Sequence, residues 1–338
     1  AWVSWADDMW RKSPGKLYAW CRGEKGPSIV ATTDRYGQWL MQPDDVVGEA
    51  TRCWGELWEN GADRPAPPGL PYGELPGMSP LTGGLLKEIV LKVSIHKAGG
   101  LDAWSIQELR ALPGPAFEDL AAVLHQVEQE GVWPRGLSGA VVSLLPKKDD
   151  HSPLQQRPIS LLPIVYRVWA AARASMLKAW LVERGHASAW GLGPGKGADT
   201  AAWMGAVQAE MAAARGEASF GAYIDCEKCY DHVDLSMLTF EGCLQGLGRL
   251  VKLAASQYRG TRFVRWAGAL GRGVTPQSGI PAGCPLANAM LHLYLFRAMR
   301  GTEEEAPGVH LRTYVDDWRL FAAGEGEQAS RQIVTGLR

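Results

Sequence analysis

The sequence has no long apolar run, no basic excess and few cysteines, and each absence excludes a class of protein. No apolar run is long enough to cross a bilayer, so an integral membrane protein is not expected. The formal net charge is −1, whereas nucleic-acid-binding chains are commonly basic, so any charge that binds phosphates has to be local. The six cysteines show no disulfide framework and suit a reducing compartment, which indicates an intracellular protein.

One Cys-x-x-Cys pair, Cys226 and Cys229, lies close to His232. A structural zinc site needs further ligands at a matching spacing, and no second close pair accompanies these thiols. Packing is therefore the expected role of Cys229.

The most informative stretch is Tyr314-Val315-Asp316-Asp317-Trp318. A strand pattern over residues 309–315 resumes over 318–321, so Asp-Asp is expected to form a two-residue hairpin loop. Adjacent carboxylates repel each other unless a cation lies between them. The stretch therefore predicts a divalent metal site, with an ordinary acidic turn as the alternative.

A third carboxylate stands in a matching context upstream. Residues 219–225 predict a buried apolar strand that ends at Asp225, before a helix that begins near residue 232. A lone buried charge is costly, so Asp225 is expected to share a cation with Asp316 at one edge of a sheet. Mg²⁺ prefers oxygen ligands, and two such ions about 3.5–4 Å apart bind the attacking and leaving oxygens in phosphoryl transfer. These carboxylates predict nucleotidyl transfer.

Five further segments stand in order around these two. They are Lys97-x-x-Gly100-x-Asp102, Leu145-Pro146-Lys147-Lys148, Arg157-Pro158-Ile159-Ser160-Leu161, the glycine-rich residues 190–197, and Gly279-Ile280-Pro281-Ala282-Gly283-Cys284-Pro285-Leu286. Together with Asp225, Tyr230-Asp231 and the Asp316 box, they resemble the reverse transcriptase domain of non-LTR retrotransposons. Each box alone is a weak signal, but seven boxes in order over about residues 80–321 are specific.

The resemblance implies an α/β (α+β) fold of the right-hand polymerase type, with fingers and a ferredoxin-like palm. The chain of 338 residues is long enough for such subdomains. The expected division is an N-terminal connector, leader and linker over residues 1–77, fingers over 78–205 and a palm with finger insertions over 206–338. Only about one helix follows the Asp316 box, so the thumb is expected to be missing and the palm truncated.

The resemblance also implies the catalytic and metal-binding residues. Asp225, Asp316 and Asp317 are the expected catalytic carboxylates and metal ligands, and the carbonyl of Cys226 is expected to help hold the second ion. The implied cofactor is Mg²⁺, as two ions, with Mn²⁺ as a substitute.

The expected nucleotide-binding residues are Lys147, Arg157, Tyr230, Ala282 and Gly283. A hairpin with lysine on one side and arginine on the other suits a triphosphate, because Arg157 binds phosphate oxygens bidentately and Lys147 acts as a point charge. Tyr230 fills the family's aromatic position against the sugar, with a core aromatic as the alternative. Gly283 lets the backbone approach the nascent base pair.

Two residues depart from the family pattern. Ala282 stands where the family has glutamine, and Asn288 stands where it commonly has proline. The first change places the nucleotide contact in question and leaves the carboxylates intact.

The implied function is RNA-directed DNA synthesis in a retroelement, which extends a primer 3′-hydroxyl with dNTPs. The implied partners are an RNA template and a DNA primer or target, with no membrane and an open oligomeric state; the location is the nucleus if the host is eukaryotic. One alternative is a degenerate polymerase fold that serves as an RNA-binding or structural module, although such relics usually lose carboxylates. Another is an intron-encoded or viral RNA-copying polymerase, against which the finger motifs and Lys97 to Asp102 favour the non-LTR type.

Two further elements are expected around the boxes. Pro43-Asp44-Asp45 begins a helix that has an apolar face and ends at Asn60-Gly61, and this helix is expected only to pack. Residues 263–276 are expected to form a hairpin whose loop is Gly271-Arg272-Gly273.

Overall fold

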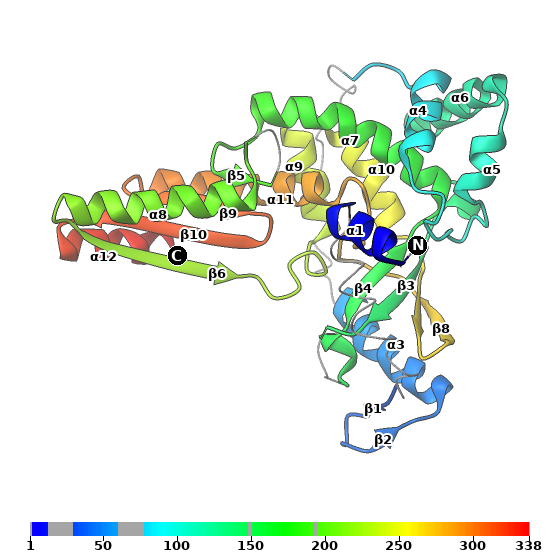
Figure 1. Ribbon diagram of the computed structural model, residues 1–338, viewed down its shortest axis with the longest axis horizontal. Helices are drawn as coiled ribbons and strands as arrows, with labels where there is room; N and C mark the ends of the chain where they lie inside the picture. Colours follow the sequence, from blue (N-terminus) through cyan, green and yellow to red (C-terminus); the bar gives the residue numbers. More distant parts are fainter. Residues whose placement is uncertain (1, 13–29, 60–77, 148–150, 192–194, 338) are drawn as a thin grey trace.

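The computed structural model describes residues 2–12, 30–59, 78–147, 151–191 and 195–337 of the chain. Within these ranges the strands form two four-stranded sheets and one two-stranded sheet, with helices between and around them (Figure 1). The mixed α/β fold expected from the sequence is confirmed. The proposed linker, Asn60-Gly61, Lys148 and residues 192–194 lie outside the described residues.

The fingers sheet has the strand order β4-β3-β7-β8, in which β3 and β7 are parallel and the other pairs are antiparallel. Helix α3 (Pro43–Glu59) packs on it, and Trp54 of this helix shares a core with Val142, Val264 and Trp266 of the strands. The strands are β3 (Ala140–Leu145), β4 (Arg157–Leu161), β7 (Arg262–Trp266) and β8 (Ala269–Val274).

The loop of the β7–β8 hairpin differs from the prediction. Trp266 pairs with Ala269, so the loop is Ala267-Gly268, and Gly271-Arg272-Gly273 lies within β8. Ala267 and Gly268 have φ of 51° and 80°. Two consecutive positive φ angles match the right-handed twist of a tight hairpin, which explains why this pair and not the glycine-rich triplet makes the turn.

A group of helices lies next to the fingers sheet, in the upper part of Figure 1, and extends toward the second sheet. Ser105 and Glu108 form a capping box at the start of α5, and Gly131, with φ of 70°, ends α6. Asp102 accepts a hydrogen bond of 3.1 Å from the N–H of Val165 and so caps α7. The elements are α4 (Gly83–Lys92), α5 (Ile106–Ala111), α6 (Gly114–Glu130), η1 (Arg135–Leu137), η2 (Pro153–Gln155), α7 (Ile164–Arg184), α9 (Leu235–Leu244) and α10 (Gly248–Tyr258).

The palm sheet has the strand order β5-β9-β10-β6. Leu320 on β10 lies in the core formed with α11 (Ala287–Glu305) and α12 (Gly326–Gly336), whereas Arg319 donates to Gln208 of α8 (Ala198–Ala214). Because successive strand side chains point to opposite faces, α8 and α12 cover opposite faces of this sheet (Figure 1). The strands are β5 (Ala189–Trp190), β6 (Ala218–Asp225), β9 (His310–Tyr314) and β10 (Asp317–Gly324).

Strand β6 is not buried, contrary to the prediction. It is the edge strand of the palm sheet, and most of its side chains are exposed, with Tyr223 at 78%. An edge strand has only one neighbour, so apolar composition alone does not bury it. Asp225 is accordingly exposed at the end of β6, and the argument from a buried charge does not apply to it.

The remaining elements are peripheral. Strands β1 (Thr32–Thr33) and β2 (Trp39–Leu40) pair antiparallel, and α1 (Trp2–Lys12) precedes them. Strand β5 joins the palm sheet, whereas β7 and β8 join the fingers sheet, so the chain crosses between the sheets more than once.

The domain boundaries near residues 77 and 205 stay predictions. Over the described part of the chain, no helix has the length and apolar character needed to cross a membrane.

Candidate active site

The hairpin that carries the two aspartates turns one residue earlier than predicted. Tyr314 pairs with Asp317, so the loop residues are Val315 and Asp316, and Asp317 already belongs to β10. Val315 has φ of 60°, which a β-branched residue rarely adopts and which costs of the order of 1–3 kcal/mol. A Cβ on Gly191 would lie 3.1 Å from the Val315 side chain, so the turn is closely packed. The strained turn places Asp316 at the tip of the hairpin.

The third predicted carboxylate lies beside this turn. In the antiparallel β10–β6 pair, Asp317 is directly opposite Asp225. Burial, and then the charges of Asp317 and Asp225, raise the pKa of Asp316 above its ordinary value. The structure thus brings Asp225, Asp316 and Asp317 to one end of the palm sheet.

The chemistry of these side chains suits a hard divalent cation. In the part of the chain that the structure describes, no three His, Cys, Asp or Glu side chains are placed closely enough to hold a metal ion as they stand. After burial, the charges of Asp317 and Asp225 contribute to the raised pKa of Asp316, and a bound cation would offset their repulsion. Carboxylate oxygens are the ligands that Mg²⁺ prefers. The ligand chemistry of these carboxylates therefore suits Mg²⁺.

The neighbouring thiols do not suit a metal. Burial raises the pKa of Cys229 to about 12 and also raises the pKa of Cys226, which disfavours the thiolate form that metals bind. Cys229 packs against the large hydrophobic core, as expected from the sequence. The carbonyl of Cys226 accepts the N–H of Cys229 at 3.2 Å and keeps a second lone pair.

Most of the predicted residues line one open pocket of about 560 Å³ between the two sheets. Two predicted residues are not in the lining but lie next to it in the sequence: Gly283 follows Ala282, and Asp317 follows Asp316. The sequence did not single out Trp54, Gln155, Gln156 or Lys228, which also line it. The predicted residues in the lining are Lys147, Arg157, Asp225, Cys226, Tyr230, Ala282 and Asp316.

The basic side of this pocket comes from the β3–β4 hairpin. Leu145 pairs with Arg157 at the loop end of this hairpin, Lys147 follows two residues after Leu145, and the Lys147 and Arg157 side chains are exposed. The N–H of Ser160 on β4 donates to the carbonyl of Ala282 at 2.8 Å. This bond joins the fingers sheet to the 279–286 loop.

Tyr230 is held at both ends. Its hydroxyl donates to Oδ1 of Asn288 at 2.7 Å, and its carbonyl accepts the N–H of Ile280 at 2.8 Å. Burial raises the pKa of Tyr230, so the phenol remains a donor. Asn288 was noted in the sequence as a departure from the family pattern, but nothing in the pattern indicated that it binds Tyr230.

Gly283 is required by the backbone packing around it. It has φ of 105°, and a Cβ there would lie 3.0 Å from the carbonyl oxygen of Ser160. Any other residue would therefore be strained and would press on β4. The predicted approach of Gly283 to a base pair stays a prediction.

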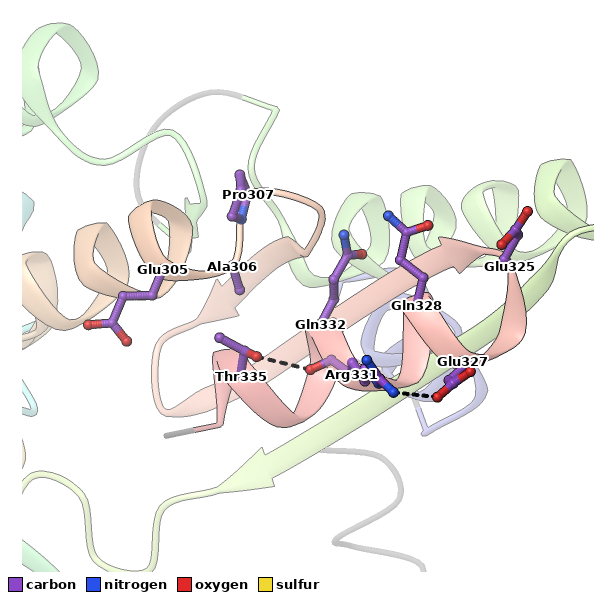
Figure 2. A pocket seen from close by; sticks show the side chains of 9 residues that line it. All are labelled: Glu305, Ala306, Pro307, Glu325, Glu327, Gln328, Arg331, Gln332 and Thr335. Atoms are coloured by element: carbon purple, nitrogen blue, oxygen red, sulfur yellow. Dashed lines mark hydrogen bonds and ion pairs between the residues drawn. The ribbon is translucent and has the colours of Figure 1, made fainter.

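A second pocket, of about 320 Å³, lies between the end of α11 and α12 (Figure 2). Three glutamates, Glu305, Glu325 and Glu327, line it, and Arg331 is paired with Glu327 one helical turn away. This acidic lining disfavours phosphate groups, and the pocket contains none of the predicted site residues. The pocket between the sheets is therefore the candidate active site.

Comparison with known proteins identifies a polymerase family. The family model described as reverse transcriptase (RNA-dependent DNA polymerase) matches residues 145–336, which include Lys147, Arg157, Asp225 and Asp316. A protein of Xenopus laevis named "Transposon TX1 uncharacterized 149 kDa protein" is 26% identical over 303 residues. The alignment covers 84% of this chain and 22% of that protein, so the chain spans about a fifth of its relative.

Proposed function

The chain belongs to the reverse transcriptase (RNA-dependent DNA polymerase) family, and we propose that it copies an RNA template into DNA by extending a primer 3′-hydroxyl with dNTPs. The observation that carries this proposal is the pocket between the sheets. Acidic residues from the palm sheet and basic residues from the fingers sheet face the same space there. A triphosphate with its metal ions needs both signs of charge.

The biological setting is proposed from the relative. That protein is named as a transposon protein, and it is much longer than this chain. We infer that this chain is the polymerase part of a non-LTR retrotransposon protein, with an RNA template and a DNA primer or target as partners. An intracellular, nuclear location stays a prediction.

The acidic residues are proposed to hold the catalytic metal. Asp225, Asp316 and Asp317 would supply carboxylate oxygens, with the free lone pair of the Cys226 carbonyl beside them. When bound, two Mg²⁺ ions, or Mn²⁺ in their place, supply the charge that activates the 3′-hydroxyl and stabilises the pyrophosphate leaving group. In this assignment the carboxylates position charge and need no protein nucleophile.

The remaining pocket residues are proposed to bind the nucleotide. Arg157 can donate two parallel hydrogen bonds to phosphate oxygens, and Lys147 adds a flexible point charge. Tyr230, held by Asn288, presents its ring toward the sugar and so discriminates against a ribose 2′-hydroxyl. Ala282 lines the pocket beside β4, and Gly283 follows it in the loop.

A degenerate, non-catalytic polymerase fold is the less favoured function. Such a protein has no need for strained turns that carry charge, yet this chain keeps Val315 at φ of 60° to present Asp316. An intron-encoded or viral RNA-copying enzyme would share the same pocket, and substrate preference separates these branches.

The proposal is tested by single-nucleotide addition to a DNA primer on an RNA template, with dNTPs and MgCl₂. One addition requires no processivity, so the assay does not depend on further domains. Template-directed addition of the complementary dNTP that stops when EDTA removes the metal supports the proposal. A protein that binds primer–template but adds no nucleotide with Mg²⁺ or Mn²⁺ supports the non-catalytic alternative.

A further inference from the structure

The last turn of α3 contacts the active site, although this helix lies outside the residues matched by the family and was expected only to pack. Trp58 is 1% exposed, and its indole N–H donates to Oδ1 of Asp231 at 2.9 Å. Asp231 directly follows Tyr230 and itself lines the pocket. A residue of α3 is thus bonded to the turn that contains Tyr230.

Trp58 also binds a second pocket segment, through its backbone. Its carbonyl accepts the N–H of Gln277 at 2.8 Å and the N–H of Ser278 at 3.1 Å. These residues directly precede the 279–286 loop that contains Ala282 and Gly283. One residue of α3 therefore joins the Tyr230 turn to the start of this loop.

A buried arginine completes the cluster. The guanidinium of Arg262 lies 4.7 Å from the centre of the Trp58 ring and donates to the carbonyl of Gly279 at 2.5 Å. Burial lowers the pKa of Arg262 to about 10, and the charge of Asp231 partly offsets this effect. Gly279 has φ of 93°, and a Cβ there would lie 3.0 Å from the carbonyl oxygen of Asp231. The two segments are therefore in close backbone contact beneath the pocket.

We propose that Trp58 is a positioning residue for the incoming nucleotide. It acts by holding the Tyr230–Asp231 turn against the start of the 279–286 loop. This inference rests on the proposed function, because the nucleotide is the ligand that the two segments would enclose. Few contacts separate Trp58 from the residues proposed to bind the nucleotide. Asp231 is the next residue after Tyr230, and the carbonyl of Tyr230 accepts the N–H of Ile280 in the loop.

The test replaces Trp58 by phenylalanine, which removes the indole N–H and keeps an apolar ring. The matched control is Trp133→Phe, because Trp133 is 5% exposed and donates its indole N–H to the carbonyl of Leu253 at 3.1 Å, away from the pocket. We expect Trp58→Phe to raise the dNTP KM about tenfold (about 1.4 kcal/mol) and to leave kcat within about threefold. Trp133→Phe is expected to keep both constants close to those of the parent chain.

Amide hydrogen exchange gives a second readout that does not depend on activity. The N–H groups of Gly279 and Ile280 donate to the carbonyls of Val233 and Tyr230, both at 2.8 Å. Loosening of the two segments should speed exchange of these amides in Trp58→Phe and not in Trp133→Phe. If Trp58→Phe fails to fold, Asp231→Ala removes the same hydrogen bond from its acceptor side.

The outcomes separate this inference from the proposed function. A parent chain that adds no nucleotide contradicts the proposed function, and the exchange rates then still decide whether Trp58 holds the segments together. If Trp58→Phe matches Trp133→Phe in both exchange and KM, the positioning role is overturned.

Discussion

Two hairpins of opposite charge meet at the pocket, and their construction differs. The β9–β10 hairpin has a two-residue loop, a strained Val315 and its carboxylates at set register positions. In the β3–β4 hairpin, residues 146–156 separate the strands, and the charges are carried by the long side chains of Lys147 and Arg157. A rigid turn suits groups that hold metal ions, whereas long side chains suit a charged ligand that has to enter and leave. We therefore expect the acidic hairpin to control kcat and the basic hairpin to control KM.

The largest fall in kcat is expected from substitution of the carboxylates on the palm sheet. Asp225→Asn and Asp316→Asn each remove a charge that the metal ions need, so each should lower kcat at least about a hundredfold, comparable to the loss of a single group that stabilises transition-state charge. Primer–template binding should change little, because the duplex is held elsewhere. Steady-state extension assays and filter binding measure the two quantities.

Glu325→Gln is the matched control for these variants, since it makes the same chemical change to an acid that lines only the second pocket. More than a tenth of the parent turnover in either aspartate variant would contradict the assignment of that carboxylate.

Substitutions of the basic residues of the β3–β4 hairpin are expected to raise the dNTP KM. Arg157→Ala removes charge-assisted hydrogen bonds worth about 1.5–3 kcal/mol, which corresponds to a rise of about 10- to 100-fold in the dNTP KM. Lys147→Ala should cost less, because a flexible point charge is less well oriented. Arg265→Ala on the same sheet is the control, since Arg265 donates to Ser143 at 3.1 Å and does not line the pocket. A fall in kcat with an unchanged dNTP KM in Arg157→Ala would contradict the expectation that the basic hairpin controls KM and the acidic hairpin controls kcat.

The sequence predicted this contrast better than it predicted the packing around it. The carboxylates were predicted from two matching strand contexts, and Lys147 and Arg157 from the ordered series of boxes that resembles the family, since each box alone is a weak signal. The exposure of β6 could not be predicted, since it depends on which strand lies at the edge of the sheet. The hydrogen bonds of Trp58 and Asn288 were missed for a similar reason: each depends on a partner, Asp231 or Tyr230, that is distant along the chain.

A smaller effect is expected where Tyr230 meets Asn288. Asn288→Ala removes the acceptor of the tyrosine hydroxyl, a bond of about 0.5–1.5 kcal/mol. If this bond orients the ring against the sugar, discrimination between dNTPs and ribonucleotides should fall about two- to twelvefold. Competition between the two nucleotides in primer extension measures the ratio.

A double-mutant cycle is the control for this prediction. Tyr230→Phe removes the same bond from its donor side, so the double variant should discriminate no worse than either single variant. Additive losses would show that Asn288 acts on the nucleotide independently of Tyr230.

The smallest effect is expected at Ala282, where the family has glutamine. The alanine lines the open pocket and is half-exposed, so a longer side chain has space to extend toward the nucleotide. Its carbonyl is bonded to the N–H of Ser160, which fixes the backbone from which that side chain would start. Oδ1 of Asn288 already accepts the Tyr230 hydroxyl, so this oxygen is not available to take the place of the missing glutamine. Ala282→Gln should therefore restore one neutral hydrogen bond of about 0.5–1.5 kcal/mol, lowering the dNTP KM a few-fold and leaving kcat within about threefold. If the pocket has instead closed around alanine, glutamine would overpack it and lower kcat/KM. Steady-state kinetics on this single substitution distinguishes the two, and a fall in kcat/KM would reject the open-pocket explanation.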